Sequence, residues 1–158
     1  CLRTCRAGDS RTVKRDVRLQ MKMKPTESEK VIGDAIDRGY ASVMNDTKWR
    51  ELCDAVLTEL PFPPPYQLKD IRRAEPDPVL FDHDVDHWGD WKEGIRPFYA
   101  VEWIRVRPRY LKQRGLLIES EVVDEGPQLL SLLERLHLRF RVEADSVLIF
   151  GVTKQEKR

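Results

Sequence analysis

The sequence is poor in residues and segments that mark several large classes of protein. It has three cysteines in 158 residues, an odd number with two in the first five positions. This count excludes a disulfide framework and favours a reducing compartment. No apolar run approaches the roughly 18 residues that a membrane-spanning helix needs, and no secretory signal is visible. We therefore expect a cytoplasmic protein that does not enter a membrane.

Motifs that carry common enzyme chemistry are also missing. The chain has no nucleophile elbow, no glycine-rich phosphate loop, no Walker lysine and no Cys/His pair in a recognised context. A general acid–base pair could still be built from His87 with Asp84 or Asp86. We expect no cofactor, and the balance favours a protein that is not an enzyme.

Charge is what the sequence has in excess. Charged side chains make up 35% of the chain, against about 25% in an average globular protein. Residues 1–24 carry a net charge of +6 and the rest carry −5, which together give the +1 of the whole chain. Because residues 1–24 have almost no apolar periodicity, we expect a basic, disordered extension, added to the natural protein or produced by a start-site error. Residues 25–158 should then form a single domain.

Apolar spacing predicts three helices. Thr26 and Glu29 form a capping-box pattern that opens the first. Asn45 marks the start of the second, whose apolar stripe includes Cys53 as a buried thiol and which Pro61 should end. The expected helices span about residues 27–43, 46–60 and 127–137.

Alternating apolar and polar side chains predict the strands. The clearest is Phe98–Arg107, where apolar residues on both faces indicate a central strand. The others are Tyr66–Ile71, Val79–Phe81, Leu116–Val123 and a final hairpin of residues 138–142 with 147–152. Because strands and helices do not alternate regularly, we expect an α+β fold. It should have a mostly antiparallel sheet of four to six strands packed by two N-terminal helices and one late helix.

Residues 81–91, FDHDVDHWGDW, form the most distinctive segment. They hold two of the three histidines, four aspartates and two of the four tryptophans. We expect a hairpin connection with Gly89 and Gly94 as turn residues. Exposed indoles and carboxylates suit a protein interface, because aromatic rings become its buried anchors and acids face a basic patch of the partner. The residues expected to contact a protein partner with a basic face are Asp82, Asp84, Asp86, Trp88, Asp90 and Trp91.

The same segment offers candidate metal ligands. Imidazole and carboxylate suit zinc or manganese, and the candidates are His83, Asp84, Asp86 and His87. In extended backbone the two imidazoles would lie about 13 Å apart, too far to share one ion, and no third histidine-rich segment completes a site. A metal-dependent hydrolase is therefore the alternative to protein binding.

A third interpretation is a nucleic-acid accessory protein that uses residues 103–114. Basic side chains interleaved with aromatic ones suit phosphate contact and base stacking. Against this, the body of the chain is acidic, and bases near a strand end more often guard against sheet-to-sheet pairing. The candidate residues are Arg105, Arg107, Arg109, Lys112 and Arg114.

Several of these segments resemble an uncharacterised family of small bacterial proteins, a domain of unknown function. The resemblance rests on Asn45-Asp46-Thr47-Lys48-Trp49 at a helix start, an Asp/Trp-rich turn, the strand Val101-Glu102-Trp103-Ile104-Arg105-Val106 and a terminal hairpin ending near Gly151. It covers about residues 44–153. The sequence departs from the family pattern in its long basic N-terminus, in the triple proline Pro63-Pro64-Pro65 and in the two histidines of residues 81–91. The resemblance implies an α+β fold and no established activity.

The leading interpretation is a non-enzymatic protein-binding module of the bacterial cytoplasm, of the immunity type that neutralises a toxin domain. Small acidic proteins with aromatic and acidic faces suit this work, because they block a basic active-site cleft by charge and shape.

Overall fold

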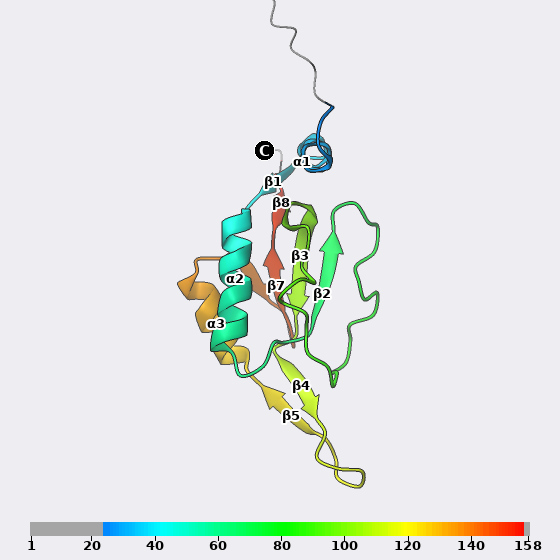
Figure 1. Ribbon diagram of the computed structural model, residues 1–158, viewed down its shortest axis with the longest axis vertical. Coiled ribbons are helices and arrows are strands. Elements are labelled where there is room, and N and C mark those ends of the chain that lie inside the picture. The colour runs from blue at the N-terminus through cyan, green and yellow to red at the C-terminus, as the bar shows by residue number, and fades with distance from the viewer. Residues whose placement is uncertain (1–23, 157–158) are drawn as a thin grey trace, which may run out of the picture.

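The computed structural model describes residues 24–156, so the basic extension lies outside the described residues except for Lys24. Figure 1 shows the arrangement of the elements. In chain order they are α1 (Glu27–Asp37), β1 (Tyr40–Ser42), α2 (Asp46–Glu59), β2 (Tyr66–Asp70), η1 (Phe98–Ala100), β3 (Val101–Val106), β4 (Arg109–Lys112), β5 (Glu121–Asp124), α3 (Gly126–Arg135), β6 (Phe140–Val142), β7 (Val147–Phe150) and β8 (Val152–Lys154). None of the described helices is long and apolar enough to cross a membrane.

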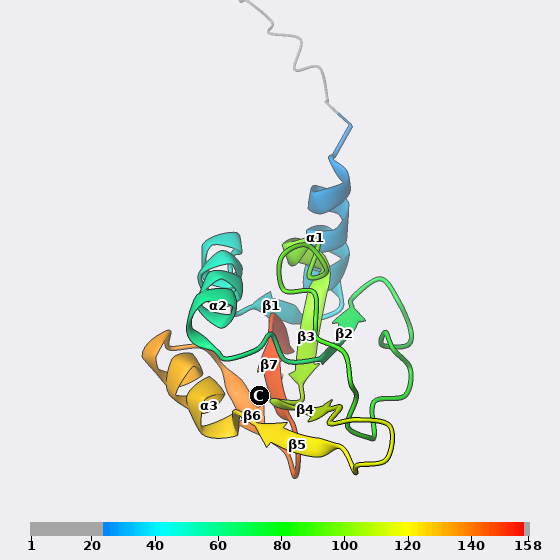
Figure 2. The ribbon, with the colours of Figure 1, turned by 60° about the horizontal axis from the view of Figure 1, so that its bottom comes forward.

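A four-stranded antiparallel sheet in the order β2–β3–β7–β6 forms the centre of the fold. The strand register sets Leu68, Ile104, Ile149 and Phe140 side by side in one row across the sheet. This row belongs to the main apolar core, together with buried side chains of α2 and α3, and both helices lie beside the sheet in Figure 2. The expected α+β fold is therefore confirmed.

Helix α2 follows its sequence pattern closely. The Asn45 side chain accepts a hydrogen bond from the Lys48 N–H at 2.9 Å, which satisfies one of the free amides at the helix start. Trp49 and Leu52 are 1% and 0% exposed. Cys53 is buried beside them, and burial raises the pKa of its thiol to about 11. A neutral, enclosed thiol of this kind is a packing residue.

Helix α1 starts as expected and ends earlier than expected. The capping box is present, with the Glu29 N–H donating to Thr26 Oγ1 at 3.3 Å and the Thr26 N–H donating to Glu29 Oε2 at 2.8 Å. The prediction of a helix to residue 43 was wrong. Gly39 adopts a positive φ of 82° and its N–H donates to Ile36 O, which reverses the chain. The following residues, Tyr40–Ser42, instead pair as β1 with β8.

Three strand predictions need correction. The expected strand Phe98–Arg107 begins only at Val101, because Phe98–Ala100 form η1. Val79–Phe81 is not a strand, because the outer edge of β2 has only a single bridge, between Leu68 and Asp77. The expected hairpin connection is the long loop of residues 71–97 between the antiparallel neighbours β2 and β3, in which Gly94 lies at a bend and Gly89 at neither a turn nor a bend. The expected strand Leu116–Val123 is displaced: β5 begins at Glu121 and pairs with β4 in a separate two-stranded sheet.

Gly151, where β7 passes into β8, is a position at which the neighbouring atoms leave no space for a side chain. Its N–H donates to Glu102 O, and its carbonyl accepts from the Val43 and Met44 N–H groups. A Cβ added here would meet the Val101 carbonyl and lie 2.9 Å from Trp49 Cζ2. The main core and the two-stranded β1–β8 sheet are therefore joined at a position that has no room for a methyl group.

We expect Gly151→Ala to lower the free energy of unfolding by about 2 kcal/mol or more, because the core side has no space to relax. Gly33→Ala is the control, since a Cβ at Gly33 meets nothing within 4 Å and alanine favours the helix interior. Urea unfolding of both variants measures the difference. Equal stability of the two variants would contradict the close packing at Gly151.

Candidate protein-binding site

Residues 81–90, called the acidic loop below, are held at their C-terminal end by the triple proline. The Gly89 N–H donates to Pro63 O at 3.1 Å, and Trp91 Nε1 donates to Pro64 O at 2.7 Å. The Tyr66 hydroxyl donates to Asp90 O at 2.7 Å. Because proline residues have fixed φ and no N–H of their own, this extended segment offers its carbonyls as rigid acceptors for the loop.

Four charged side chains, the charge cluster of Asp84, Arg107, Arg109 and Asp145, hold the other end of the loop. Arg109 Nε donates to Asp84 Oδ1 at 2.7 Å, and Arg107 Nη2 lies 3.1 Å from Asp145 Oδ2. The Arg107 side chain is only 3% exposed, and its Nη2 also donates to Phe81 O at 3.0 Å. A buried guanidinium needs such partners, because an unpaired buried charge is strongly destabilising.

The middle of the loop lies along β4. The Leu111 N–H donates to Val85 O at 2.8 Å, so the loop occupies part of the free edge of the β4–β5 hairpin. The Trp88 ring meets Tyr110 edge-on at 6.3 Å between centroids, and Tyr110 meets the buried Phe62 in the same way at 4.2 Å. Trp88 nevertheless remains 58% exposed.

The structure separates the six residues expected to contact a partner. Trp88 is exposed, and so are the carboxylates of Asp82 and Asp86. Asp84 is turned towards Arg109, and Asp90 Oδ1 accepts from the Lys92 and Glu93 N–H groups at 3.1 and 3.0 Å. Trp91 lies in the core, 1% exposed. Asp90 is nevertheless exposed, so the accessible part of the predicted surface is one indole with three acids, Asp82, Asp86 and Asp90.

The candidate metal ligands do not converge. His83 Nδ1 is within 2.9 Å of Asp82 Oδ1, and this hydrogen bond lowers the pKa of the Asp82 carboxyl. His87 and Asp86 are exposed, and Asp84 is engaged by arginine. Within residues 24–156, no group of three or more His, Cys, Asp or Glu side chains is arranged to hold a metal ion.

The candidate nucleic-acid residues are largely paired with acids. Arg107 and Arg109 belong to the charge cluster. Arg105 Nη2 lies 3.1 Å from Glu143 Oε2, and Arg114 Nε lies 3.9 Å from Glu121 Oε2. Lys112 is exposed. The basic stretch read from the sequence is therefore interleaved in space with carboxylates from other segments, which reduces its attraction for phosphate.

Sequence reasoning missed an apolar component of this end of the molecule. The β4–β5 hairpin projects from the body (Figure 1), and Leu116, Leu117 and Ile118 at its tip are 104%, 99% and 58% exposed. Val79 and Leu80, which directly precede the acidic loop, are 59% and 74% exposed. The sequence signal for this exposed apolar tip was the run Leu116-Leu117-Ile118 within a polar stretch. Large exposed apolar patches commonly mark interaction sites.

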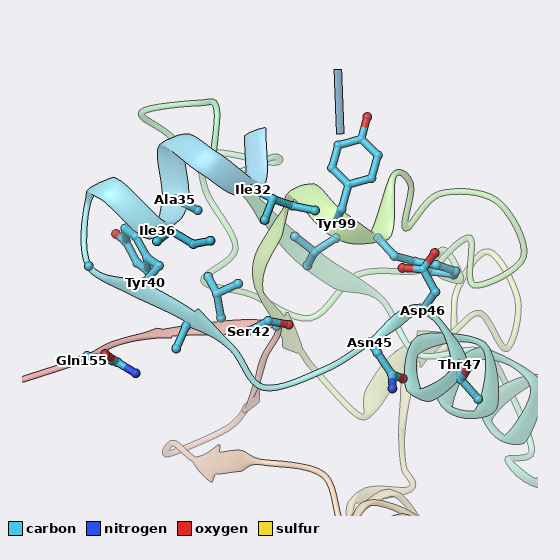
Figure 3. Close-up of a pocket in the computed structure, with 16 residues that line it drawn as sticks. Ile32, Ala35, Ile36, Tyr40, Ser42, Asn45, Asp46, Thr47, Tyr99 and Gln155 are labelled. Atoms are coloured by element: carbon cyan, nitrogen blue, oxygen red, sulfur yellow. The ribbon is translucent and has the colours of Figure 1, made fainter. Parts of the chain in front are cut away.

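A cavity of about 740 Å³ lies at the opposite end of the molecule, between α1, β1, η1 and the start of α2. Figure 3 shows Ile32, Ala35 and Ile36 of α1 facing Tyr99 and Tyr40 across this space. Asp46 is its charged lining residue. This cavity shares no lining residue with the acidic loop, so the two are separate features of the surface.

Glu125 is a buried carboxyl beneath the base of the hairpin. It is 1% exposed, and the Phe62 N–H approaches its Oε2 at 3.4 Å. In the described part of the chain its Oε1 has no hydrogen-bond partner. Burial raises the pKa of this carboxyl from 4.5 to about 7. The Glu125 carboxyl beneath the hairpin therefore changes its charge near neutral pH.

Comparison with known proteins gives a family match. A model described as a family of unknown function, DUF6678, matches residues 32–156. The matched range includes the acidic loop, the charge cluster and the hairpin. No curated protein and no solved structure matches the chain.

The raised pKa of Glu125 predicts a pH-dependent stability. Because burial raises the folded-state pKa of Glu125 above 4.5, the folded protein favours the neutral carboxyl. Its contribution to the free energy of unfolding is complete below about pH 4.5 and is lost as the pH rises through about 7. Between pH 5.5 and 8.5 the wild-type free energy of unfolding should fall by up to about 2 kcal/mol, and Glu125→Gln should remove this fall. The control is Glu121→Gln, at an exposed carboxylate. A fall of the same size in Glu125→Gln would contradict the assignment.

The charge cluster predicts unequal costs for two arginines. Arg107→Met should lower the free energy of unfolding by about 2 kcal/mol, because Asp84 and Asp145 lose a buried partner. Arg141→Met should cost less than about 0.5 kcal/mol, because the Arg141 side chain is 63% exposed in its pair with Glu143. Denaturant unfolding tests both, and an Arg107→Met variant as stable as wild type would refute the structural role of the cluster.

Proposed function

The chain belongs to the DUF6678 family, a family of unknown function, and we propose that it is a non-enzymatic protein-binding module that docks through its acidic loop. The observation that carries this proposal is the exposure of Trp88 on a loop fixed at both ends. An indole that is 58% exposed on a rigid support suits binding, because little conformational freedom is lost when a partner covers it.

The energetics of interfaces support this use of Trp88. Tryptophan is among the residues most enriched at the centres of protein interfaces, where its truncation often costs 2 kcal/mol or more. The hydrogen bond to Val85 O and the ring contact with Tyr110 restrain the backbone and ring on the inner side of the loop. The outer face of the indole remains free for a partner.

Charge indicates the kind of partner. Asp82, Asp86 and Asp90 are exposed on the same loop as Trp88, and residues 25–158 together carry a net charge of −5. Such a surface attracts a basic face and speeds association with it at low ionic strength. Asp84 is already engaged by Arg109, so partner contact falls to the exposed acids Asp82, Asp86 and Asp90.

Within this class we favour an immunity-type role in the bacterial cytoplasm, in which the acidic loop covers the basic cleft of a toxin domain. A basic cleft that binds nucleic acid or another anionic substrate would match both the charge and the single aromatic anchor. The acidic loop would then inhibit by occupying the place of the substrate.

Site-specific photo-crosslinking tests the binding role. A photo-reactive phenylalanine analogue is placed at position 88, or at Leu57 of α2 as a control, since Leu57 is also apolar and 42% exposed. In native cells we expect one dominant adduct from position 88 that position 57 does not give. The same adducts from both positions, or none from position 88, would contradict the proposal.

The recovered partner then allows a quantitative test. Trp88→Ala should weaken its affinity at least about 30-fold, whereas Leu57→Ala should change it less than about twofold. Asp86→Asn should slow association, and the difference from wild type should shrink as salt is raised. Growth arrest by the partner alone, relieved by wild type and not by Trp88→Ala, would identify the immunity role.

A further inference from the structure

The hairpin tip and the cavity are complementary features of one chain. The tip presents Leu116 and Leu117 entirely to solvent and Ile118 by more than half of its surface. The cavity of about 740 Å³ is walled by Ile32, Ile36 and other apolar side chains, and these two isoleucines remain 47% and 63% exposed. We propose that the tip of one copy docks in the cavity of a second copy, giving head-to-tail self-association.

The tip is suited to act as an inserting element. Gly115, with a positive φ of 143°, opens the turn before the leucines. At the base of the hairpin the Glu125 N–H donates to Pro108 O at 2.7 Å, and the Leu111 N–H donates to Val85 O. The base is therefore fixed on the body, and the apolar tip is presented at a defined place and reaches beyond the rest of the surface (Figure 1).

The cavity is suited to receive branched apolar side chains. Its inner wall comes from the apolar face of α1 and from η1 and β8, as Figure 3 shows for Ile32, Ile36 and Tyr99. Its charged lining residue is Asp46. Lys112 and Arg114 precede the three apolar residues and Glu119 and Glu121 follow them, so a seated tip has a basic and an acidic side, and the orientation that brings the basic side to Asp46 is favoured.

Geometry decides that the second copy, and not the same chain, supplies the tip. The β4–β5 hairpin and α1, which lines the cavity, lie at opposite ends of the molecule in Figure 1. A contact between two different surfaces leaves one tip and one cavity free in each pair, so association does not have to stop at two copies. Because the contact is small compared with a standard interface, we expect a dissociation constant roughly between 1 µM and 1 mM.

Sedimentation velocity of the full chain from about 5 µM to about 1 mM tests this directly. The wild-type weight-average mass should rise with concentration and pass that of a dimer. Leu116→Asn/Leu117→Asn, which removes the tip, and Ile36→Asp, which polarises the cavity, should each remain monomeric. Leu57→Asp, at an exposed apolar site outside both features, should associate like wild type.

The decisive experiment mixes the tip variant with the cavity variant. The tip variant retains a cavity and the cavity variant retains a tip, so an equimolar mixture should form a dimer that neither forms alone, and should stop there. Circular dichroism and thermal unfolding check that both variants fold. A monomeric wild type at the highest concentration, association that survives loss of the tip, or a mixture that stays monomeric would each overturn the proposal. The outcome is independent of Trp88 and its partner.

Discussion

The buried guanidinium of Arg107 is the constraint on which this end of the molecule depends. It follows the central strand β3 and links three other segments: its backbone N–H donates to Pro65 O, and its side chain donates to Phe81 O and pairs with Asp145. A charge that is 3% exposed is tolerated only where such partners surround it. The triple proline, through the backbone N–H, and the acidic loop and the turn between β6 and β7, through the side chain, are therefore fixed relative to the sheet by one residue.

This constraint explains why the aspartates and histidines of this segment are not gathered in one cluster and do not form a uniformly acidic surface. Asp84 is committed to the arginines and Asp90 to its own turn. What reaches solvent is Trp88 with both histidines and the carboxylates of Asp82, Asp86 and Asp90. The same arginines that suggested phosphate binding in the sequence hold this loop in place. One set of ion pairs thus decides both the shape of the proposed docking surface and its charge.

Features set by nearby residues could be read from the sequence. The caps at Thr26 and Asn45, the buried stripe of α2 and the start of α3 depend on side chains within about one helical turn. Strand β1 could not be read, because its partner β8 lies at the other end of the chain, and the spacing from Tyr40 onwards imitates a helix. The two tryptophans of the loop have similar local surroundings, and only the position of the Pro64 carbonyl decides that Trp91 is the buried one.

Amide hydrogen exchange at Leu111 tests the central claim most directly, because its N–H joins β4 to the acidic loop through Val85 O. If the charge cluster holds the loop in place, Leu111 in the wild-type protein should exchange at least about tenfold more slowly than in Asp84→Ala, while amides of α2 stay unchanged. Exchange at Leu111 as fast as at Leu117 in the exposed tip, in the wild type itself, would show that the loop is not anchored and would contradict the account.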